Sequence, residues 1–118
     1  MKYLDLAIRI AKGGTEERNY RIGCVGIRTD GAIVVAPNLL TKKPEHKAHA
    51  ESRVISKSDA GVILYVARIL RNDAIALAKP CVKCQALIKN RRVKRVFYTI
   101  SNSEYGVWDP EYDINDDQ

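Results

Sequence analysis

Two short stretches carry residue types that could bind a metal ion and move protons: His49-Ala50-Glu51 and Pro80-Cys81-Val82-Lys83-Cys84. The two cysteines are three residues apart, so at the start of a helix both thiols lie on one face. The positive end of the helix dipole favours thiolates, the form of cysteine that binds zinc. His49, Cys81 and Cys84 make three protein ligands, and tetrahedral zinc with three protein ligands keeps a fourth position for water.

Glu51 stands two residues after His49, and on a helix this offset turns its carboxylate away from the direction of the ligand. We therefore predict that Glu51 stands beside the water and is not a fourth ligand. Zinc lowers the pKa of a bound water towards about 7, and a neighbouring carboxylate takes up the proton and passes it on. The combination of His-x-Glu with Pro-Cys-x-x-Cys resembles the signature of zinc-dependent nucleobase deaminases, which implies hydrolytic removal of an exocyclic amine at C4 of cytosine or C6 of adenine.

Each half of this pattern also has a simpler interpretation. A Cys-x-x-Cys pair alone is also found as a redox pair or as half of a structural zinc site. The fourth ligand of a structural site would have to be His46 or Cys24, but we expect a solvated histidine at the first position and a buried, inert thiol at the second. A redox pair would leave His49 unexplained, and a non-catalytic zinc-binding interaction module would have no use for Glu51.

The elements that must position these residues follow from hydrophobic periodicity and turn residues. Helices are predicted over residues 2–12, 49–58 and 80–90, the last opened by Pro80. Strands are predicted over residues 22–28, 32–36, 62–70, 74–78 and 93–100, with turns at 29–31 and 71–73. Residues 37–47 are predicted to form a polar, basic loop.

The order of these elements predicts an α/β fold with a single mixed β-sheet sandwiched by helices. Two β-α-β passages need crossover helices, so part of the sheet is expected to be parallel. We expect one deaminase domain over residues 1–107 and an acidic, partly disordered tail over residues 108–118. Neither a secretory signal nor an apolar run long enough for a membrane span is present in the sequence, so a cytoplasmic protein without a membrane partner is expected.

Charge is distributed unevenly along the chain. All 20 Lys and Arg lie at or before Arg95, whereas six of the 14 Asp and Glu lie at or after Glu104. Residues 1–103 therefore carry a formal charge of +12, and the last fifteen residues carry −6. A basic body favours an anionic partner such as a nucleotide phosphate or a nucleic acid, although a solubilising surface has the same composition.

The combination of the two stretches resembles the cytidine and deoxycytidylate deaminase superfamily, whose zinc-dependent members carry His-x-Glu and Pro-Cys-x-x-Cys. The resemblance covers Tyr3 to Ile100, and Ile-Gly-Cys-Val at residues 22–25 resembles the first strand of the family. It implies a cytidine deaminase-like fold that binds Zn²⁺ through the histidine and both cysteines, with the glutamate as proton shuttle. It also implies that Asn38 contacts the substrate and that the backbone N–H of Ala50 meets the base.

Three features depart from the pattern of the family. Residues 71–79 intervene before Pro80, where the family strand runs straight on, and we interpret them as a hairpin. Lys79 stands where the family often has Glu, Ser or Thr, and we interpret it as a solvated lysine and not as a phosphate contact. Only 18 residues follow Ile100, so a shortened C-terminus is expected, with the family's fifth strand and last helix missing or replaced.

Two classes of substrate fit the sequence. A cytosine nucleotide such as dCMP is the first, its phosphate held by lysines from the loop before the metal site, Lys42, Lys43 and Lys47. Single-stranded DNA or RNA is the alternative, held in a basic groove with aromatic stacking platforms, for which the candidates are residues 91–95, Tyr98, Tyr105 and Trp108. Adenosine in tRNA is a less favoured alternative to these two classes. A homo-oligomer is also expected, since a shortened sheet leaves an edge to cover.

Overall fold

The structure is a computed structural model that describes residues 1–13, 20–38 and 49–112. Its elements are, in chain order, α1 (Lys2–Lys12), β1 (Tyr20–Ile27), β2 (Ile33–Pro37), α2 (Ala50–Ile55), β3 (Ile63–Leu70), β4 (Ile75–Ala76), α3 (Val82–Asn90), β5 (Arg95–Thr99), β6 (Tyr105–Trp108) and the 3₁₀ helix η2 (Pro110–Tyr112). His46 lies outside the described residues, as do the loop lysines that were predicted to hold a phosphate, Lys42, Lys43 and Lys47. No described helix is long and apolar enough to cross a membrane.

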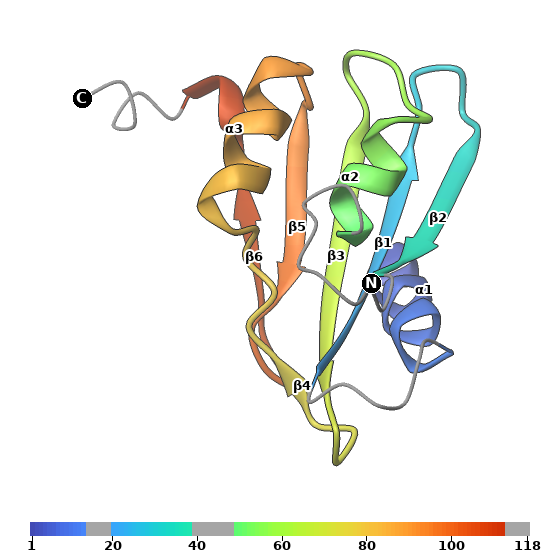
Figure 1. Cartoon of the computed structure of the whole chain (residues 1–118), viewed down its shortest axis with the longest axis vertical. Helices are drawn as coiled ribbons and strands as arrows, with labels where there is room; N and C mark the ends of the chain where they lie inside the picture. The colour runs from blue at the N-terminus through green and yellow to red at the C-terminus, as the bar shows by residue number, and fades with distance from the viewer. Residues whose placement is uncertain (14–19, 39–48, 113–118) are drawn as a thin grey trace.

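The strands form one mixed sheet in the order β2-β1-β3-β5-β6, with β4 paired to the end of β3 (Figure 1). Among the described strands, β3 and β5 form the one parallel pair, with Ile63 opposite Arg95 and Val66 opposite Tyr98. The remaining pairings are antiparallel. Short connections join β1 to β2, β3 to β4 and β5 to β6, and β1 also pairs antiparallel with β3, which follows it after β2 and α2. The predicted fold class, a mixed sheet between helices, is confirmed.

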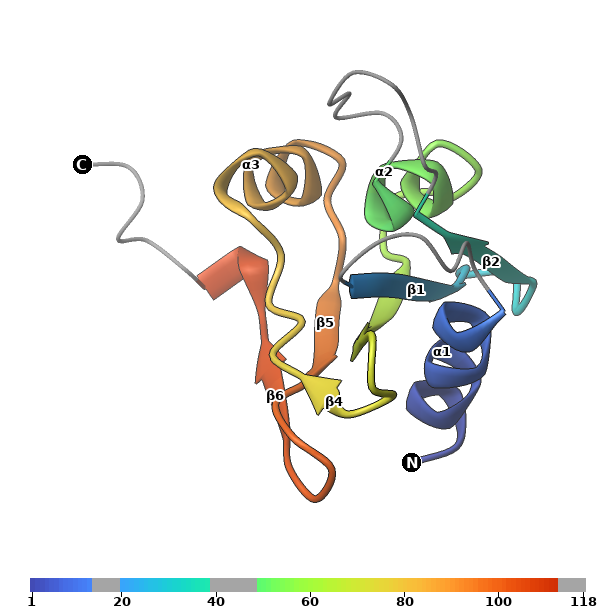
Figure 2. The same cartoon turned by 60° about the horizontal axis from the view of Figure 1, so that its bottom comes forward.

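Helices cover both faces of the sheet, α1 on one face and α2 with α3 on the other (Figure 2). The α1 face buries Ala7 against Val25 and Ala67. The close approach of α1 to β1 requires glycine at position 23, because a Cβ there would lie 2.2 Å from the carbonyl oxygen of Ala7. The opposite face holds the larger core, which includes Val54, Ile55, Leu64, Val66, Ile88 and Val96.

The structure corrects several predicted boundaries. Helix α2 ends at Ile55, three residues before the predicted end, and α3 begins at Val82, so Pro80 precedes the N-cap and does not occupy the first turn. Strand β6 was not predicted: it pairs antiparallel with β5 and places Trp108 in the larger core. The expected acidic tail therefore begins within described structure, while residues 113–118 lie outside it.

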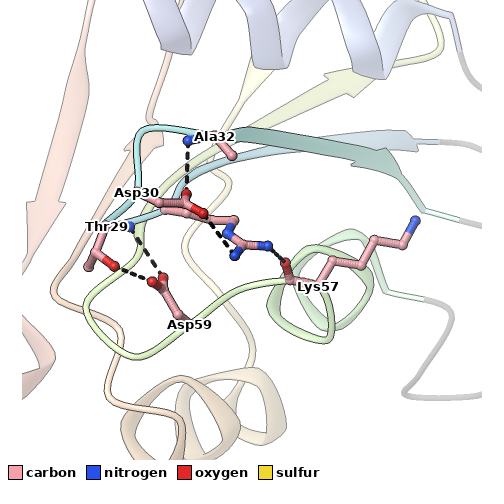
Figure 3. Close-up of polar contacts among 6 residues, drawn as sticks. Thr29, Asp30, Ala32, Lys57 and Asp59 are labelled. Carbon is pink, nitrogen blue, oxygen red and sulfur yellow. Dashed lines mark hydrogen bonds and ion pairs between the residues drawn. The ribbon is translucent and has the colours of Figure 1, made fainter.

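A small polar network ties the β1–β2 turn to the segment between α2 and β3 (Figure 3). The Asp59 carboxylate accepts hydrogen bonds from the hydroxyl and the backbone N–H of Thr29. Arg28 donates to the carbonyl of Lys57 at 3.2 Å and to Asp30 at 3.0 Å. These contacts fix the chain directly after α2, the short helix that carries Glu51.

The hydrogen bond from the Thr29 hydroxyl holds the pKa of Asp59 below its ordinary value. A carboxyl whose pKa is lower in the folded than in the unfolded state stabilises the fold above its ordinary pKa of about 4, and this contribution is lost as the pH falls further. We predict that Thr29→Val lowers the free energy of unfolding at pH 7 and that the difference from the unmodified chain shrinks at pH 3. Urea unfolding at both pH values tests this; an unchanged difference would contradict it.

Candidate active site

The topology brings the first residues of α2 and α3 to the same edge of the sheet. Helix α2 leads into β3 and α3 leads into β5, and these two strands are parallel. Each helix runs back against its following strand, so both helix N-termini lie at the carboxyl ends of β3 and β5. His49 is the N-cap of α2 and Cys81 is the N-cap of α3, each with extended backbone and without a side-chain capping hydrogen bond. Both side chains are therefore directed elsewhere than to their own helices.

The three predicted ligands converge at this edge. His49 Nδ1 lies 3.3 Å from Cys84 Sγ and 4.0 Å from Cys81 Sγ. All three ligand atoms lie within 4.8 Å of one another. Nitrogen and sulfur ligands of one tetrahedral zinc ion stand about 3.6 Å apart, given the usual Zn–N and Zn–S bond lengths. The geometry of this group therefore fits a single zinc ion.

The charges of the two cysteine thiolates and of Glu51 also favour a bound cation. Burial raises the pKa of the Cys84 thiol well above its ordinary value, and the nearby Glu51 and Cys81 raise it further. Two thiolates and a carboxylate crowded at one partly buried site repel one another, and a divalent ion offsets that repulsion. Zinc binding and thiol ionisation are therefore coupled at this site.

Glu51 lies near this group but is not one of its three ligands. Its side chain is buried, with the residue 4% exposed, and burial raises the pKa of its carboxyl above the ordinary value. Its Oε1 atom is buried and accepts no hydrogen bond from the residues that the structure describes. Such an atom is costly unless a donor enters from the cavity, and the carboxylate is thus positioned to accept a proton from a molecule bound there.

A cavity of about 230 Å³ opens directly onto these residues. Its described lining includes His49, Glu51 and Cys81. The other lining residues are three apolar ones, Ile22, Leu77 and Ala78, and two cations, Arg68 and Lys79. The apolar side chains suit a flat ring, and the polar groups would fix its orientation. Leu77 is 53% exposed, so its side chain offers an apolar surface to a ligand at the cavity mouth.

The two residues expected to contact substrate are not among the described lining residues of this cavity. Asn38 is buried against β1, where its Oδ1 accepts the N–H of Ile22 at 2.9 Å and its own N–H donates to the Ile22 carbonyl. It thereby holds one wall of the cavity in place. Ala50 is the first residue of α2 and fully buried, and the N–H of a first helical residue has no acceptor within its helix. Direct contact of either residue with substrate stays a prediction.

The alternative of a fourth protein ligand is not met by Cys24. This thiol is fully buried in the larger core, and it does not belong to the metal-binding group found among the described residues. Burial raises its pKa, with Glu51 and Cys84 contributing, so it stays a protonated, inert thiol as predicted. The group within the described part of the chain therefore has three ligands, as a catalytic zinc site does.

Sequence reasoning missed the cavity wall that β3 and β4 supply. Arg68 is the single charged residue in the otherwise apolar strand Ile63–Leu70, and a charge at that position was the available signal. The predicted hairpin is confirmed, since Arg68 pairs with Ala76 and Ile69 with Ile75. Its return brings Leu77 to the cavity, and Lys79, interpreted from the sequence as solvated, is exposed but lines the cavity.

Comparison with known proteins identifies the family of the chain. Residues 1–100 match the cytidine and deoxycytidylate deaminase zinc-binding region, and the chain belongs to this family of deaminases. Zinc is accordingly its cofactor, and the His-Cys-Cys group is able to hold it. A tRNA-specific adenosine deaminase of Rickettsia bellii (strain RML369-C) is 22% identical over 100 residues, which cover 85% of this chain and 69% of that protein.

Solved structures of cytidine deaminases share the fold. The enzyme from Burkholderia pseudomallei superposes with a TM-score of 0.67 at 14% identity, over 90% of this chain and 91% of that one. The enzyme from Mycobacterium leprae gives a TM-score of 0.65 at 17% identity, over 91% of this chain and 89% of that one. At such identities the likeness establishes the fold and leaves the substrate open.

We predict that Cys84→Ala abolishes stable zinc binding while Cys24→Ala retains it. Both substitutions remove a buried thiol of the same core, but only the first removes a member of the three-ligand group. Loss of a ligand should weaken zinc binding by more than the roughly 10- to 100-fold that loss of an outer-shell partner costs. Elemental analysis after dialysis measures the zinc content of each variant. Equal zinc content in the two variants would contradict the assignment of the ligands.

Proposed function

We propose that the chain is a hydrolytic deaminase that converts the cytosine amine of a nucleotide such as dCMP to the carbonyl of uracil, with release of ammonia. The observation that supports this most directly is the position of the metal-binding group and Glu51 at one cavity. The three ligand atoms converge, and two of these ligands, His49 and Cys81, line one cavity together with Glu51. The buried Oε1 of Glu51 has no hydrogen-bond partner among the described residues. Structural zinc sites are closed by four ligands and require no carboxylate at their side, so a non-catalytic zinc module accounts for this arrangement poorly.

The residues of the chain divide the work between binding and proton transfer. His49, Cys81 and Cys84 would hold zinc, which when bound supplies the Lewis acidity that activates a water molecule. Glu51 would accept a proton from that water and deliver it to the ring nitrogen N3 as the oxygen adds to C4. It would then carry the second proton of the water to the amine, so that the C4–N bond breaks and ammonia leaves. Water and cytosine are thereby consumed, and uracil and ammonia are formed.

The raised pKa of Glu51 suits this role, because a carboxyl with a pKa closer to neutrality both accepts and returns a proton readily. The apolar part of the cavity lining also favours the reaction, because charge that develops on the ring beside apolar groups is screened less than in water. The Ile22 and Leu77 walls would hold the ring between them.

Some of the residues considered for a polynucleotide groove are unavailable to a ligand. Trp108 is 9% exposed and belongs to the core, and Tyr98 packs against that core. Arg95 binds Asp109 at 2.6 Å, so its charge is already compensated. Of the three rings considered for stacking, Tyr105 alone is largely exposed, at 51%. One exposed ring is a weak platform for a single strand, so we favour the nucleotide as substrate.

Replacement of Glu51 by glutamine tests the proton shuttle. The two side chains have nearly the same shape, so Glu51→Gln should keep the zinc content and the melting temperature of the unmodified protein. Loss of a general acid-base group is expected to lower kcat by at least about 100-fold. Ammonia release and zinc content are measured on the same preparation, and full activity of the variant would refute the mechanism.

A panel of substrates tests the choice of base and of nucleotide. The zinc-loaded protein is incubated with dCMP, deoxycytidine, an oligonucleotide with internal cytosine, and an RNA stem-loop with adenosine, and base conversion is measured by mass spectrometry. We expect the highest kcat/KM with dCMP. Faster conversion of the oligonucleotide or of adenosine would replace the proposed substrate by that one and leave the zinc chemistry unchanged.

A further inference from the structure

The β3–β4 hairpin contributes a charged wall to the cavity that the metal site does not use. Arg68 lies on β3 with the same side-chain orientation as Leu64 and Val66, toward the face that α2 and α3 cover. Its side chain lines the cavity together with His49 and Glu51. Arg68 is half-buried and its Nε atom is buried. Because the residue lines the cavity, part of it is accessible to a ligand bound there.

The backbone that carries Arg68 is held on both sides. It pairs with Ile22 of β1 on one side and with Ala76 of β4 on the other. Its N–H donates to Thr99 Oγ1 at 3.3 Å, and that hydroxyl donates to the Ala76 carbonyl at 2.8 Å. The Ala78 N–H in turn donates to the Thr99 carbonyl at 2.9 Å. A recognition residue built on such a fixed strand is more precise than one on a loop.

The tip of the hairpin is anchored independently of the cavity. Arg21 of β1 is buried and donates to the Asp73 carboxylate at 2.6 Å and to the Leu70 carbonyl at 3.3 Å. Asp73 has a φ of 65°, a conformation that aspartate adopts in tight turns. The return segment is therefore fixed where it brings Lys79 to the cavity.

Two cations then face one acid across the cavity. Glu51 is the only acid among the described lining residues, and Arg68 and Lys79 are the cations. A neutral pyrimidine ring offers no charge to either cation, whereas a phosphate offers about two negative charges and several acceptor oxygens. The planar guanidinium group suits a two-pronged contact with phosphate oxygens, and an ammonium group serves as a point charge beside it.

We propose that Arg68, with Lys79 at the cavity mouth, forms an anion subsite that recognises the phosphate monoester of the nucleotide substrate. This inference rests on the proposed function, since it names the residues that separate a nucleotide from its nucleoside at the same site. Arg68 is the main determinant because it is part of the cavity wall. Lys79 is exposed, so it contributes less.

The test compares dCMP with deoxycytidine, which differ only in the phosphate. In Arg68→Gln, kcat/KM for dCMP should fall about 10- to 100-fold, as expected for loss of a hydrogen bond between charged groups. The change should appear mainly in KM, and deoxycytidine should be affected less than about twofold. Arg68→Lys should restore part of the loss because it keeps the charge. Lys79→Gln should show the same selectivity at smaller size.

Lys94→Gln is the matched control for Lys79. Lys94 is also exposed, but it precedes β5 at the edge of the sheet away from the cavity, where its N–H donates to the Val62 carbonyl. Lys94→Gln should leave kcat/KM unchanged for both dCMP and deoxycytidine. Equal losses for dCMP and deoxycytidine in Arg68→Gln would overturn the proposal, because they would indicate a structural role or contact with the base. An oligonucleotide with internal cytosine that is preferred to dCMP and depends equally on Arg68 would also overturn it.

Equilibrium binding separates failure of this proposal from failure of the proposed function. Inorganic phosphate and dUMP are titrated into the zinc-loaded protein and into Arg68→Gln, whose folding is checked by melting temperature and zinc content. Weaker binding of both ligands to the variant supports the subsite even if no cytosine compound is deaminated. Unchanged binding refutes the subsite even if dCMP is the substrate. Lys79→Gln supplies the same comparison should Arg68→Gln fail to fold.

Discussion

The parallel pairing of β3 with β5 is the constraint on which the site depends. It forces the helices before these strands, α2 and α3, to begin at one edge of the sheet, and so brings His49 and the two cysteines within reach of a single ion. Both N-caps have extended backbone, which aims the His49 and Cys81 side chains away from their own helices. The dipoles of both helices direct positive potential at the same place, where thiolates must be stabilised.

Burial gives this arrangement its chemical character. The larger core extends from Ile88 and Val54 up to Cys84, which is itself a member of that core. Cys84 and Glu51 are buried and shielded from water, so burial raises the pKa of both groups, whereas Cys81 is exposed. The Glu51 carboxylate lines the cavity, and no donor from the described part of the chain reaches its Oε1, which is unfavourable for folding and favourable for proton transfer.

Much of this was predictable from the sequence because the relevant signals are local. The spacing of Cys81 and Cys84, and the position of His49 and Glu51 at a predicted helix start, predicted a group that the structure brings together. Helix α1 and strand β3 were predicted nearly to the residue. Strand β6 was missed because Tyr105–Trp108 is too short to show a clear period and is fixed by pairing with β5. The role of Arg68 was missed because contact between a strand and a cavity depends on tertiary packing that spacing alone does not encode.

The anchoring of the β3–β4 hairpin has a consequence for how such a site diversifies. The metal ligands are fixed by the starts of two helices, whereas this wall is fixed by Arg21, Thr99 and the strand pairing of residues 68–76. The hydrogen bond from the Ala78 N–H to the Thr99 carbonyl fixes the chain between the hairpin and Cys81. Residues at the hairpin tip can therefore be inserted, deleted or exchanged without displacing a metal ligand. The fold thereby keeps its reactive centre constant and leaves the adjoining surface free to acquire new selectivity.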